Sequence, residues 1–262
     1  MEELSPAPRA QLLDAEQPLV LTGPPGAVSG EFHVRNSGSE KMRVAGVRLR
    51  PSAGGGKIGM RSRLASMLQD DGVELRRIVV RPGQSRPVPV ALSLDPRTPP
   101  GTYHLELQVQ DQMRDVLMHI TENVSLRISP DNVVLPSLPG GKVTKHVVFT
   151  NDGNVPIEVR TIGTVVLDDE LASCRALRGA LSDVGDTMTT LDEFAAALGK
   201  RFKVLYDTMV LKVQNSAITL EPGQTESVKL TITLPENLDK RARYSGYAAI
   251  STSSLAFTIV PA

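Results

Sequence analysis

The sequence has 262 residues, which is long for a single small sandwich and sufficient for two domains that each bury a core. Lysine and arginine number 29, equal to aspartate and glutamate, and no basic run occurs, which argues against binding of nucleic acid or anionic lipid. Aromatic residues make up 3% of the chain and tryptophan is absent, which argues against the stacking platforms of sugar-binding or single-strand-binding proteins.

The amino-terminal segment and the cysteine content bear on the compartment. The first residues, MEELSPAPRAQLL, lack the charged and apolar regions of a signal peptide, and no apolar run approaches the roughly 18 residues of a membrane span. The single cysteine, Cys174, excludes an internal disulfide, and we expect it to be a small buried hydrophobe. The expectation is a soluble chain without membrane insertion, periplasmic or at the cell surface if a signal peptide has been removed, otherwise cytoplasmic.

The first half of the chain has the pattern of β-strands joined by tight turns. In EFHVRNSGSEKMRVAGVRL, an apolar strand runs into Asn36-Ser-Gly, and a second apolar strand follows. The segment RSRLASMLQD then predicts a short helical insert. After Pro82-Gly83-Gln84, apolar and other residues alternate from Val88 to Leu94, and a second alternating run follows Tyr103.

The second half repeats this pattern. Asn151 matches Asn36 at an offset of 115 residues, Pro222 of the second Pro-Gly-Gln matches Pro82 at an offset of 140, and Tyr244 matches Tyr103 at an offset of 141. The sequence therefore predicts a tandem repeat of one all-β unit.

The growth of the offset from 115 to 140 places about 25 additional residues in the second copy. In the interval between Asn151 and the second Pro-Gly-Gln, apolar residues recur at helical spacing after the acidic start at residues 168–170, and Thr190 with Glu193 has the form of a capping box. The predicted helix stripes are Leu171, Cys174, Leu177, Leu181 and Val184, followed by Leu191, Phe194, Leu198, Phe202 and Leu205. The sequence thus predicts two helices inserted at about residues 168–206.

Several motifs of the second copy resemble a known family. The segments VVFTNDGNVPIEV, LEPGQTESVKLTITLP and YSGYAAIST are similar to the turn and strand pattern of bacterial immunoglobulin-like domains of cell-surface, adhesion-related and periplasmic proteins. The resemblance implies an immunoglobulin-like fold and no particular activity. A narrower relative is the two-domain pilus-assembly chaperone of the periplasm, which binds an extended subunit strand.

No segment of the sequence assembles the residues of a catalytic or metal site. The four histidines lie singly, without cysteine or histidine at metal-ligand spacing, and no Gly-x-Ser-x-Gly motif occurs. SAGGGKIG lacks the hydroxyl residue that follows lysine in a phosphate loop, and NDGN at residues 151–154 lacks the distal glutamate of a calcium loop. A flexible loop and a tight hairpin, respectively, are the favoured interpretations.

Together these patterns predict an all-β protein of two tandem immunoglobulin-like β-sandwiches, the second with a helical insertion. The predicted domains are residues 13–128 and 129–262. The predicted function is a non-catalytic structural, adhesion or assembly protein, without cofactor or metal, that contacts a protein partner or self-associates. Alternatives are a periplasmic chaperone that binds a subunit strand and an accessory carbohydrate-binding module of an enzyme. The candidate contact residues lie in the insert, which packs on its own domain or on a partner, and are Phe194, Leu198 and Phe202.

Overall fold

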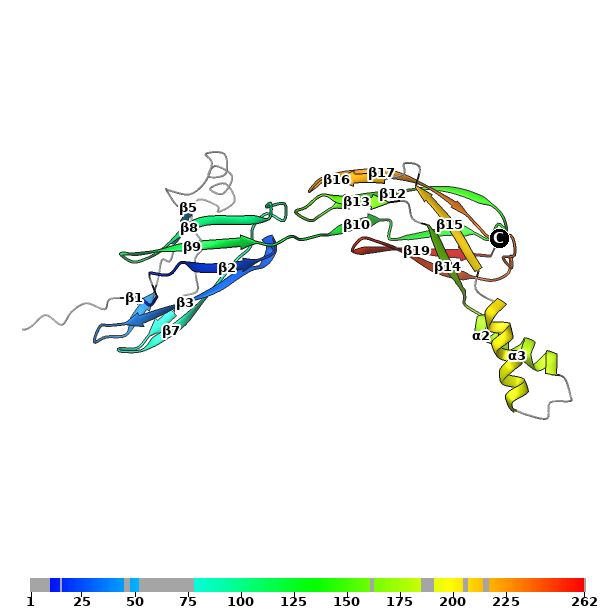
Figure 1. Cartoon of the computed structure of the whole chain (residues 1–262), viewed down its shortest axis with the longest axis horizontal. Helices are drawn as coiled ribbons and strands as arrows, with labels where there is room; N and C mark the ends of the chain where they lie inside the picture. The colour runs from blue at the N-terminus through cyan, green and yellow to red at the C-terminus, as the bar shows by residue number, and fades with distance from the viewer. Residues whose placement is uncertain are drawn as a thin grey trace, which may run out of the picture. The chain divides into compact units, whose positions relative to one another are not determined.

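The regular structure of the described residues is mostly β-strand, with two α-helices, and the chain is divided into two compact units (Figure 1). The computed structural model describes residues 10–14, 16–44, 48–51, 78–160, 163–184, 191–204, 207–213 and 217–261. Unit 1 comprises Met1–Asn123 with Gly153–Val155, and unit 2 comprises Val124–Asp152 with Pro156–Ala262. Each unit contains its own cluster of buried apolar side chains. The short insert predicted in RSRLASMLQD and the SAGGGKIG segment lie outside the described residues.

The strands of unit 1 form one larger sheet and one two-stranded sheet. In the larger sheet the order is β1-β3-β2-β9-β8-β5, with β7 paired to β3, and β4 pairs with β6 in the smaller sheet. Strand β2 runs parallel to β9, whereas the other pairings are antiparallel. The strands are β1 Ala10–Leu12, β2 Leu19–Gly23, β3 Val28–Asn36, β4 Met42–Val44, β5 Arg48–Pro51, β6 Ile78–Val80, β7 Ser85–Leu92, β8 Gly101–Val109 and β9 Gln112–Ile120.

Unit 2 repeats most of these pairings. Its larger sheet has the order β10-β12-β17-β15-β14-β18-β19-β11, and β13 pairs with β16. Strand β11 runs parallel to β19, as β2 does to β9. The strands are β10 Leu126–Ser129, β11 Asn132–Pro136, β12 Lys142–Asn151, β13 Ile157–Arg160, β14 Thr164–Asp169, β15 Asp207–Val213, β16 Ala217–Leu220, β17 Thr225–Thr233, β18 Tyr244–Ile250 and β19 Ser253–Val260.

The strand β10 corrects one detail of the sequence interpretation. The predicted first domain ends at residue 128, but Leu126–Ser129 pairs with β12, and Ile128 lies in the core of unit 2. The pairing of Leu126 with Asn151 corresponds to that of Ala10 with Asn36 in unit 1. This strand therefore opens unit 2, and the compact units divide between Asn123 and Val124.

In each unit the Asn motif and the Pro-Gly-Gln turn are joined by hydrogen bonds. The Asn36 side-chain amide donates to the Val80 carbonyl at 3.0 Å, and its backbone carbonyl accepts from Gly83 at 2.9 Å. In unit 2 the Asn151 amide donates to the Leu220 carbonyl at 2.8 Å, and Gly223 donates to the Asn151 carbonyl at 2.8 Å. Gly83 and Gly223 have φ of 70° and 78°, the left-handed conformation that the third position of a type II turn requires. Both asparagines are fully buried.

The alternating residues after each turn face the cores, as the sequence pattern predicts. All four matched pairs at offset 140 are buried, and Val88 and Val228 lie opposite Phe32 and Val147 in corresponding registers. The pairs are Val88 and Val228, Val90 and Leu230, Leu92 and Ile232, and Leu94 and Leu234.

The matched tyrosines occupy corresponding corners of the two units. The Tyr103 hydroxyl at the start of β8 donates to the Pro99 carbonyl at 2.7 Å. The Tyr244 hydroxyl at the start of β18 accepts from the Asp239 amide at 3.0 Å. Each phenol thus ties its strand to the preceding loop, which resembles the tyrosine corner of immunoglobulin-like folds.

Candidate protein-binding surfaces

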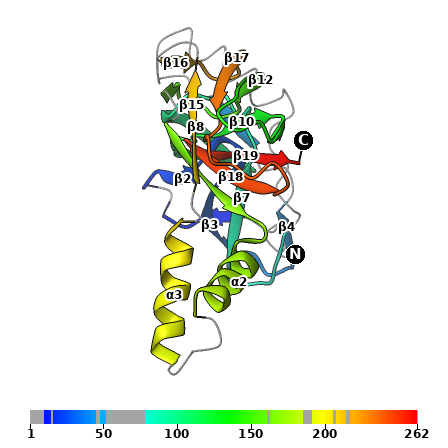
Figure 2. The same ribbon diagram turned by 90° about the vertical axis from the view of Figure 1, so that its right-hand side faces the viewer.

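Two helices leave the sheet of unit 2 between β14 and β15. They are α2 Ala172–Val184 and α3 Leu191–Val204, and both lie within the predicted insert. Figure 1 and Figure 2 show them extending beyond the ends of the strands and lying beside each other. The two helices pack on each other.

The predicted apolar stripe of the first helix faces solvent rather than the protein. Leu177 and Leu181 are 46% and 53% exposed, whereas Ala176 and Ala180 are buried. The small alanines at i and i+4 bring the helices close together, so the larger leucines one position along lie outside the contact. Cys174 is also exposed, so the expectation of a buried thiol was wrong.

The three predicted contact residues all lie on α3. Phe194 and Leu198 are partly buried, and their role as contact residues stays a prediction. The side chain of Phe202 lies outside the described residues, as does Thr190 of the predicted capping box. Exposed apolar surface is instead provided chiefly by Leu171, Leu177, Leu181 and Leu191, which we call the leucine surface.

Charged residues attach the start of α2 to the sheet of unit 2. Arg175 lies 3.1 Å from the buried carboxylate of Asp169 and 3.0 Å from that of Asp239. The second oxygen of Asp169 accepts from the Leu171 amide at 2.8 Å. Asp169 ends strand β14, so it does not begin the helix as predicted. The Arg175 guanidinium, paired with both carboxylates, fixes the direction in which the helix leaves the sheet.

A second ion pair joins the two helices. The Arg201 guanidinium on α3 donates to both carboxylate oxygens of Asp183 on α2, at 2.7 and 2.5 Å. These hydrogen bonds lower the pKa of the Asp183 carboxyl. Because the pair is exposed, it contributes more to the geometry of the hairpin than to its stability.

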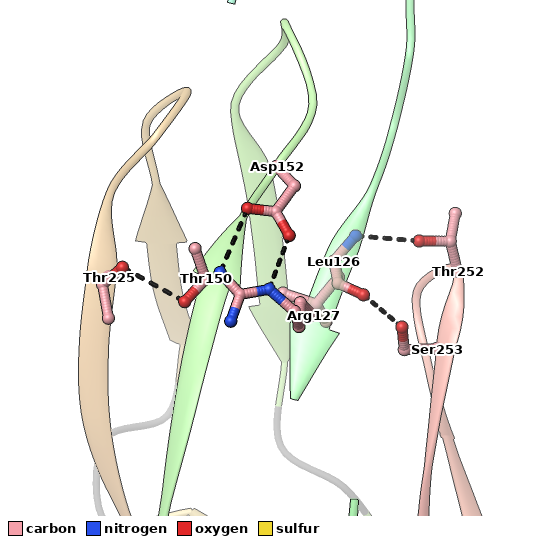
Figure 3. Close-up of polar contacts among 7 residues, drawn as sticks. All are labelled: Leu126, Arg127, Thr150, Asp152, Thr225, Thr252 and Ser253. Carbon is pink, nitrogen blue, oxygen red and sulfur yellow. Dashed lines mark hydrogen bonds and ion pairs between the residues drawn. The ribbon is translucent and has the colours of Figure 1, made fainter. Parts of the chain in front are cut away.

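The edge strand β10 is a second possible contact surface, because sheet edges can accept a strand from another chain. Figure 3 shows that the backbone of Leu126 already has partners on the side away from β12. Its amide donates to the Thr252 hydroxyl at 3.0 Å, and its carbonyl accepts from the Ser253 hydroxyl. The turn between β18 and β19 therefore closes this edge at Leu126.

The remaining contacts in Figure 3 join β12 to its two neighbours, β10 and β17. Arg127 donates to Asp152 at 2.8 Å, and the Thr150 and Thr225 hydroxyls share a hydrogen bond of 3.1 Å. Both residues of the ion pair are largely exposed, so it contributes little to stability. These residues join neighbouring strands and do not enclose a site.

The described residues contain no group of three or more histidine, cysteine or acidic side chains that could hold a metal ion. The NDGN segment links β12 to β13, which pair with other strands and not with each other, so the predicted tight hairpin is not formed there. Its two asparagine side chains bond to backbone groups. Asn154 donates to the carbonyls of Thr98 and Thr121, and its oxygen accepts from the Asn123 amide, all within unit 1. In the described part of the chain, neither helix is long and apolar enough to cross a membrane.

The residues that position the hairpin were not found from the sequence. Arg175 and Asp239 are 64 residues apart, and no motif connects them. The buried alanines of α2 could have been recognised, since Ala176 and Ala180 share one face of a helix.

No family model matches the chain, and no curated protein matches it. Solved structures of PapD-like and immunoglobulin-like β-sandwich domains are similar to it. The class 5 fimbriae chaperone CfaA has 10% identity over 97% of this chain and 100% of that chain, with a TM-score of 0.26. The PapD-like domain 7 of human CEP192 has 12% identity over 51% of this chain and 81% of that chain, also with a TM-score of 0.26. Titin domains Z1Z2 in complex with telethonin have 12% identity over 97% and 96%, with a TM-score of 0.25. Likeness at these levels carries no argument about activity or partner.

Proposed function

We propose that this chain is a non-catalytic protein-binding module made of two tandem immunoglobulin-like sandwiches, and that the helical hairpin of unit 2 contacts a protein partner. A structural, adhesion or assembly role follows from such contacts. The outer surface of the hairpin is the recognition element, and the strands are the scaffold that carries it.

The strand order supports the proposed architecture. In unit 2, β10-β12-β17-β15 and β14-β18-β19-β11 follow each other in one path, which matches the two strand sets of an immunoglobulin-like sandwich with a split first strand. Unit 1 has two of the same features. Its second strand runs parallel to its last strand, and Tyr103 on β8 corresponds to Tyr244 on β18.

The observation that carries the proposed function is the exposure of leucine on a helix pair with a fixed attachment. Leu177 and Leu181 lie one turn apart on α2, and Leu191 at the start of α3 is 79% exposed. Large apolar side chains grouped in this way are characteristic of a contact surface. The ion pairs of Arg175 hold the direction of the hairpin, so that less conformational freedom is lost on binding.

The strand-binding chaperone is less well supported by the described residues. The last strands of both units are paired on both sides, β9 with β8 and β2, and β19 with β18 and β11. The edge of β10 is closed at Leu126. No observation on the described residues favours the carbohydrate-binding alternative.

The single cysteine allows a direct test, because Cys174 lies beside the leucine surface and is exposed. A thiol-reactive photo-crosslinker attached to Cys174 in the purified full chain is expected to capture a discrete protein adduct from extracts of the native cells. Leu177→Glu combined with Leu181→Glu should abolish the adduct while circular dichroism remains unchanged, since both side chains are exposed.

A matched control places the same crosslinker elsewhere in unit 2. In the variant Cys174→Ser with Thr144→Cys, the probe lies at an exposed position of β12. Adducts that form equally well from both positions, or that persist after the leucine substitutions, would contradict a role for the hairpin.

A further inference from the structure

A separate surface of unit 2 is unusually poor in charge. The strands β14, β18, β19 and β11 are adjacent, and alternate side chains on them point away from the core. Among these outward side chains only Asp168, at the end of β14, carries a charge. Tyr247 lies in the middle of this surface with 70% of its side chain exposed, and Val166 and Val134 are more than half exposed. We call this surface the Tyr247 face.

The internal repeat provides a reference for the Tyr247 face. Tyr103 and Tyr244 occupy equivalent positions, so Tyr247 corresponds to Glu106 of unit 1. In unit 1 Glu106 lies between Arg50 and Asp115 in the register. One scaffold therefore carries a charged row in unit 1 and an apolar row in unit 2. The difference cannot be a requirement of the fold.

Charge depletion with an exposed aromatic residue is characteristic of the centre of a protein interface. In a two-fold symmetric contact each residue near the axis meets its own copy, so a charged surface repels itself and an uncharged one does not. The whole chain is also formally neutral at pH 7, so no net repulsion keeps two copies apart. Both properties favour a second copy of this chain as the occupant of the face.

The side-chain sizes on the face also suit self-association. Tyr247 lies directly opposite Ala256 on β19, and Ala249 is the next outward residue of β18. A large ring thus stands beside two small side chains. When a second copy is rotated by 180° about an axis near Tyr247, each ring can lie over the alanines of the other copy.

We infer that the Tyr247 face is a homodimer interface, in which two copies of unit 2 pack sheet against sheet about a two-fold axis near Tyr247. Four strands about 4.8 Å apart and about six residues long cover roughly 400 Å² in plan. This is about half of the ~800 Å² per partner in a standard interface. The dimer is therefore weak and reversible.

The test is sedimentation equilibrium of the full chain over as wide a range of concentrations as its solubility permits. The expected result is a monomer–dimer equilibrium whose Kd rises at least about tenfold in Tyr247→Glu, since truncation or charging of a central aromatic residue weakens interfaces by this order. Thr144→Glu, which adds the same charge at an exposed position of β12, should leave the Kd unchanged. An equimolar mixture of Tyr247→Glu and Tyr247→Lys chains should associate more tightly than either variant alone, because opposite charges then meet at the axis.

A second variant distinguishes self-association through the Tyr247 face from self-association through the leucine surface. Leu177→Glu with Leu181→Glu should leave the dimer Kd unchanged, because these residues lie on the hairpin and not on the sheet. The inference is overturned if the chain is monomeric at every concentration, or if Thr144→Glu weakens the dimer as strongly as Tyr247→Glu does. It is also overturned if only the leucine variant abolishes association, in which case self-contact belongs to the hairpin.

Discussion

Two buried asparagines hold corresponding turns in the two units. The Asn36 and Asn151 side chains each satisfy a backbone carbonyl of a neighbouring strand, Val80 and Leu220 respectively. Their own carbonyls hold the glycines of the Pro-Gly turns. The Asn motif and the Pro-Gly-Gln motif occur together in both copies because each asparagine holds the glycine of its Pro-Gly turn.

Removal of the side-chain amide of Asn36 or of Asn151 should lower the stability of the protein. Asn36→Ala and Asn151→Ala each leave a buried carbonyl without its donor, and we expect a loss of about 1–3 kcal/mol in the free energy of unfolding. Hydrogen exchange should locate the loss in unit 1 for the first variant and in unit 2 for the second. Asn237→Ala, which removes an amide that bonds Asp207 at an exposed site, is the control and should change stability by less than about 0.5 kcal/mol. Equal stability of all three variants would contradict this role.

Tyr244 gives the stability a pH dependence of known sign. Burial raises the pKa of its phenol above the ordinary value of 10.0, so the folded protein holds this proton more tightly than the unfolded chain does. The stabilisation is complete below pH 10.0 and is lost as the pH rises through the folded pKa. Tyr244→Phe removes this dependence together with the hydrogen bond from Asp239, which contributes about 1 kcal/mol. The difference in stability between the wild type and this variant should therefore narrow above pH 10.0 in alkaline denaturation, and a constant difference would contradict the assignment.

At the level of secondary structure, the helical hairpin contains two glycines whose substitution by alanine should stabilise it to different extents. A Cβ added at Gly199 on α3 meets nothing within 4 Å, whereas one added at Gly179 on α2 lies 3.1 Å from the Arg201 guanidinium. Gly199→Ala should stabilise the hairpin by about 1 kcal/mol through helix propensity. Gly179→Ala should gain less, because Arg201 must move away from Asp183. Hydrogen exchange in α2 and α3 measures both effects, and an equal gain in the two variants would show that the ion pair does not constrain the helices.

For the hairpin, helical spacing in the sequence predicts that helices form but not which side of each helix is buried. The periodicity of the insert predicted two helices, and two lie there. It did not predict which side each helix buries, because Leu177 and Ala176 are adjacent in sequence and either stripe is compatible with a helix. In the structure Ala176 and Ala180 are buried, whereas Leu177, Leu181 and Cys174 are exposed.

Over the whole molecule, the repeat could be predicted because turn residues and strand alternation are local signals. Matching of Asn36 with Asn151 and of Tyr103 with Tyr244 predicted the repeat, and the matched residues make corresponding contacts in the two units. The Tyr247 face could not be found in this way. Its residues come from strands that are distant in sequence, and only their pairing brings Val166, Tyr247 and Val134 to one surface.

The two copies differ where they face solvent. Unit 1 carries Glu106 and Asp115 at the positions where unit 2 carries Tyr247 and Ala256. Unit 2 alone has the described helical hairpin with exposed leucines. We therefore propose that contacts with other proteins are concentrated in the second unit, and that the outer sheet face of unit 1 remains in water.

Hydroxyl-radical footprinting of the full chain, in dilute buffer and in extracts of the native cells, tests this proposal most directly. We expect the extract to reduce oxidation of Leu177 and Leu181, and a high concentration of the chain itself to reduce oxidation of Tyr247. Met113 and Leu117 on the outer face of unit 1 should be oxidised equally in all of these conditions. Protection confined to Met113 and Leu117, or no protection in unit 2, would contradict the proposal.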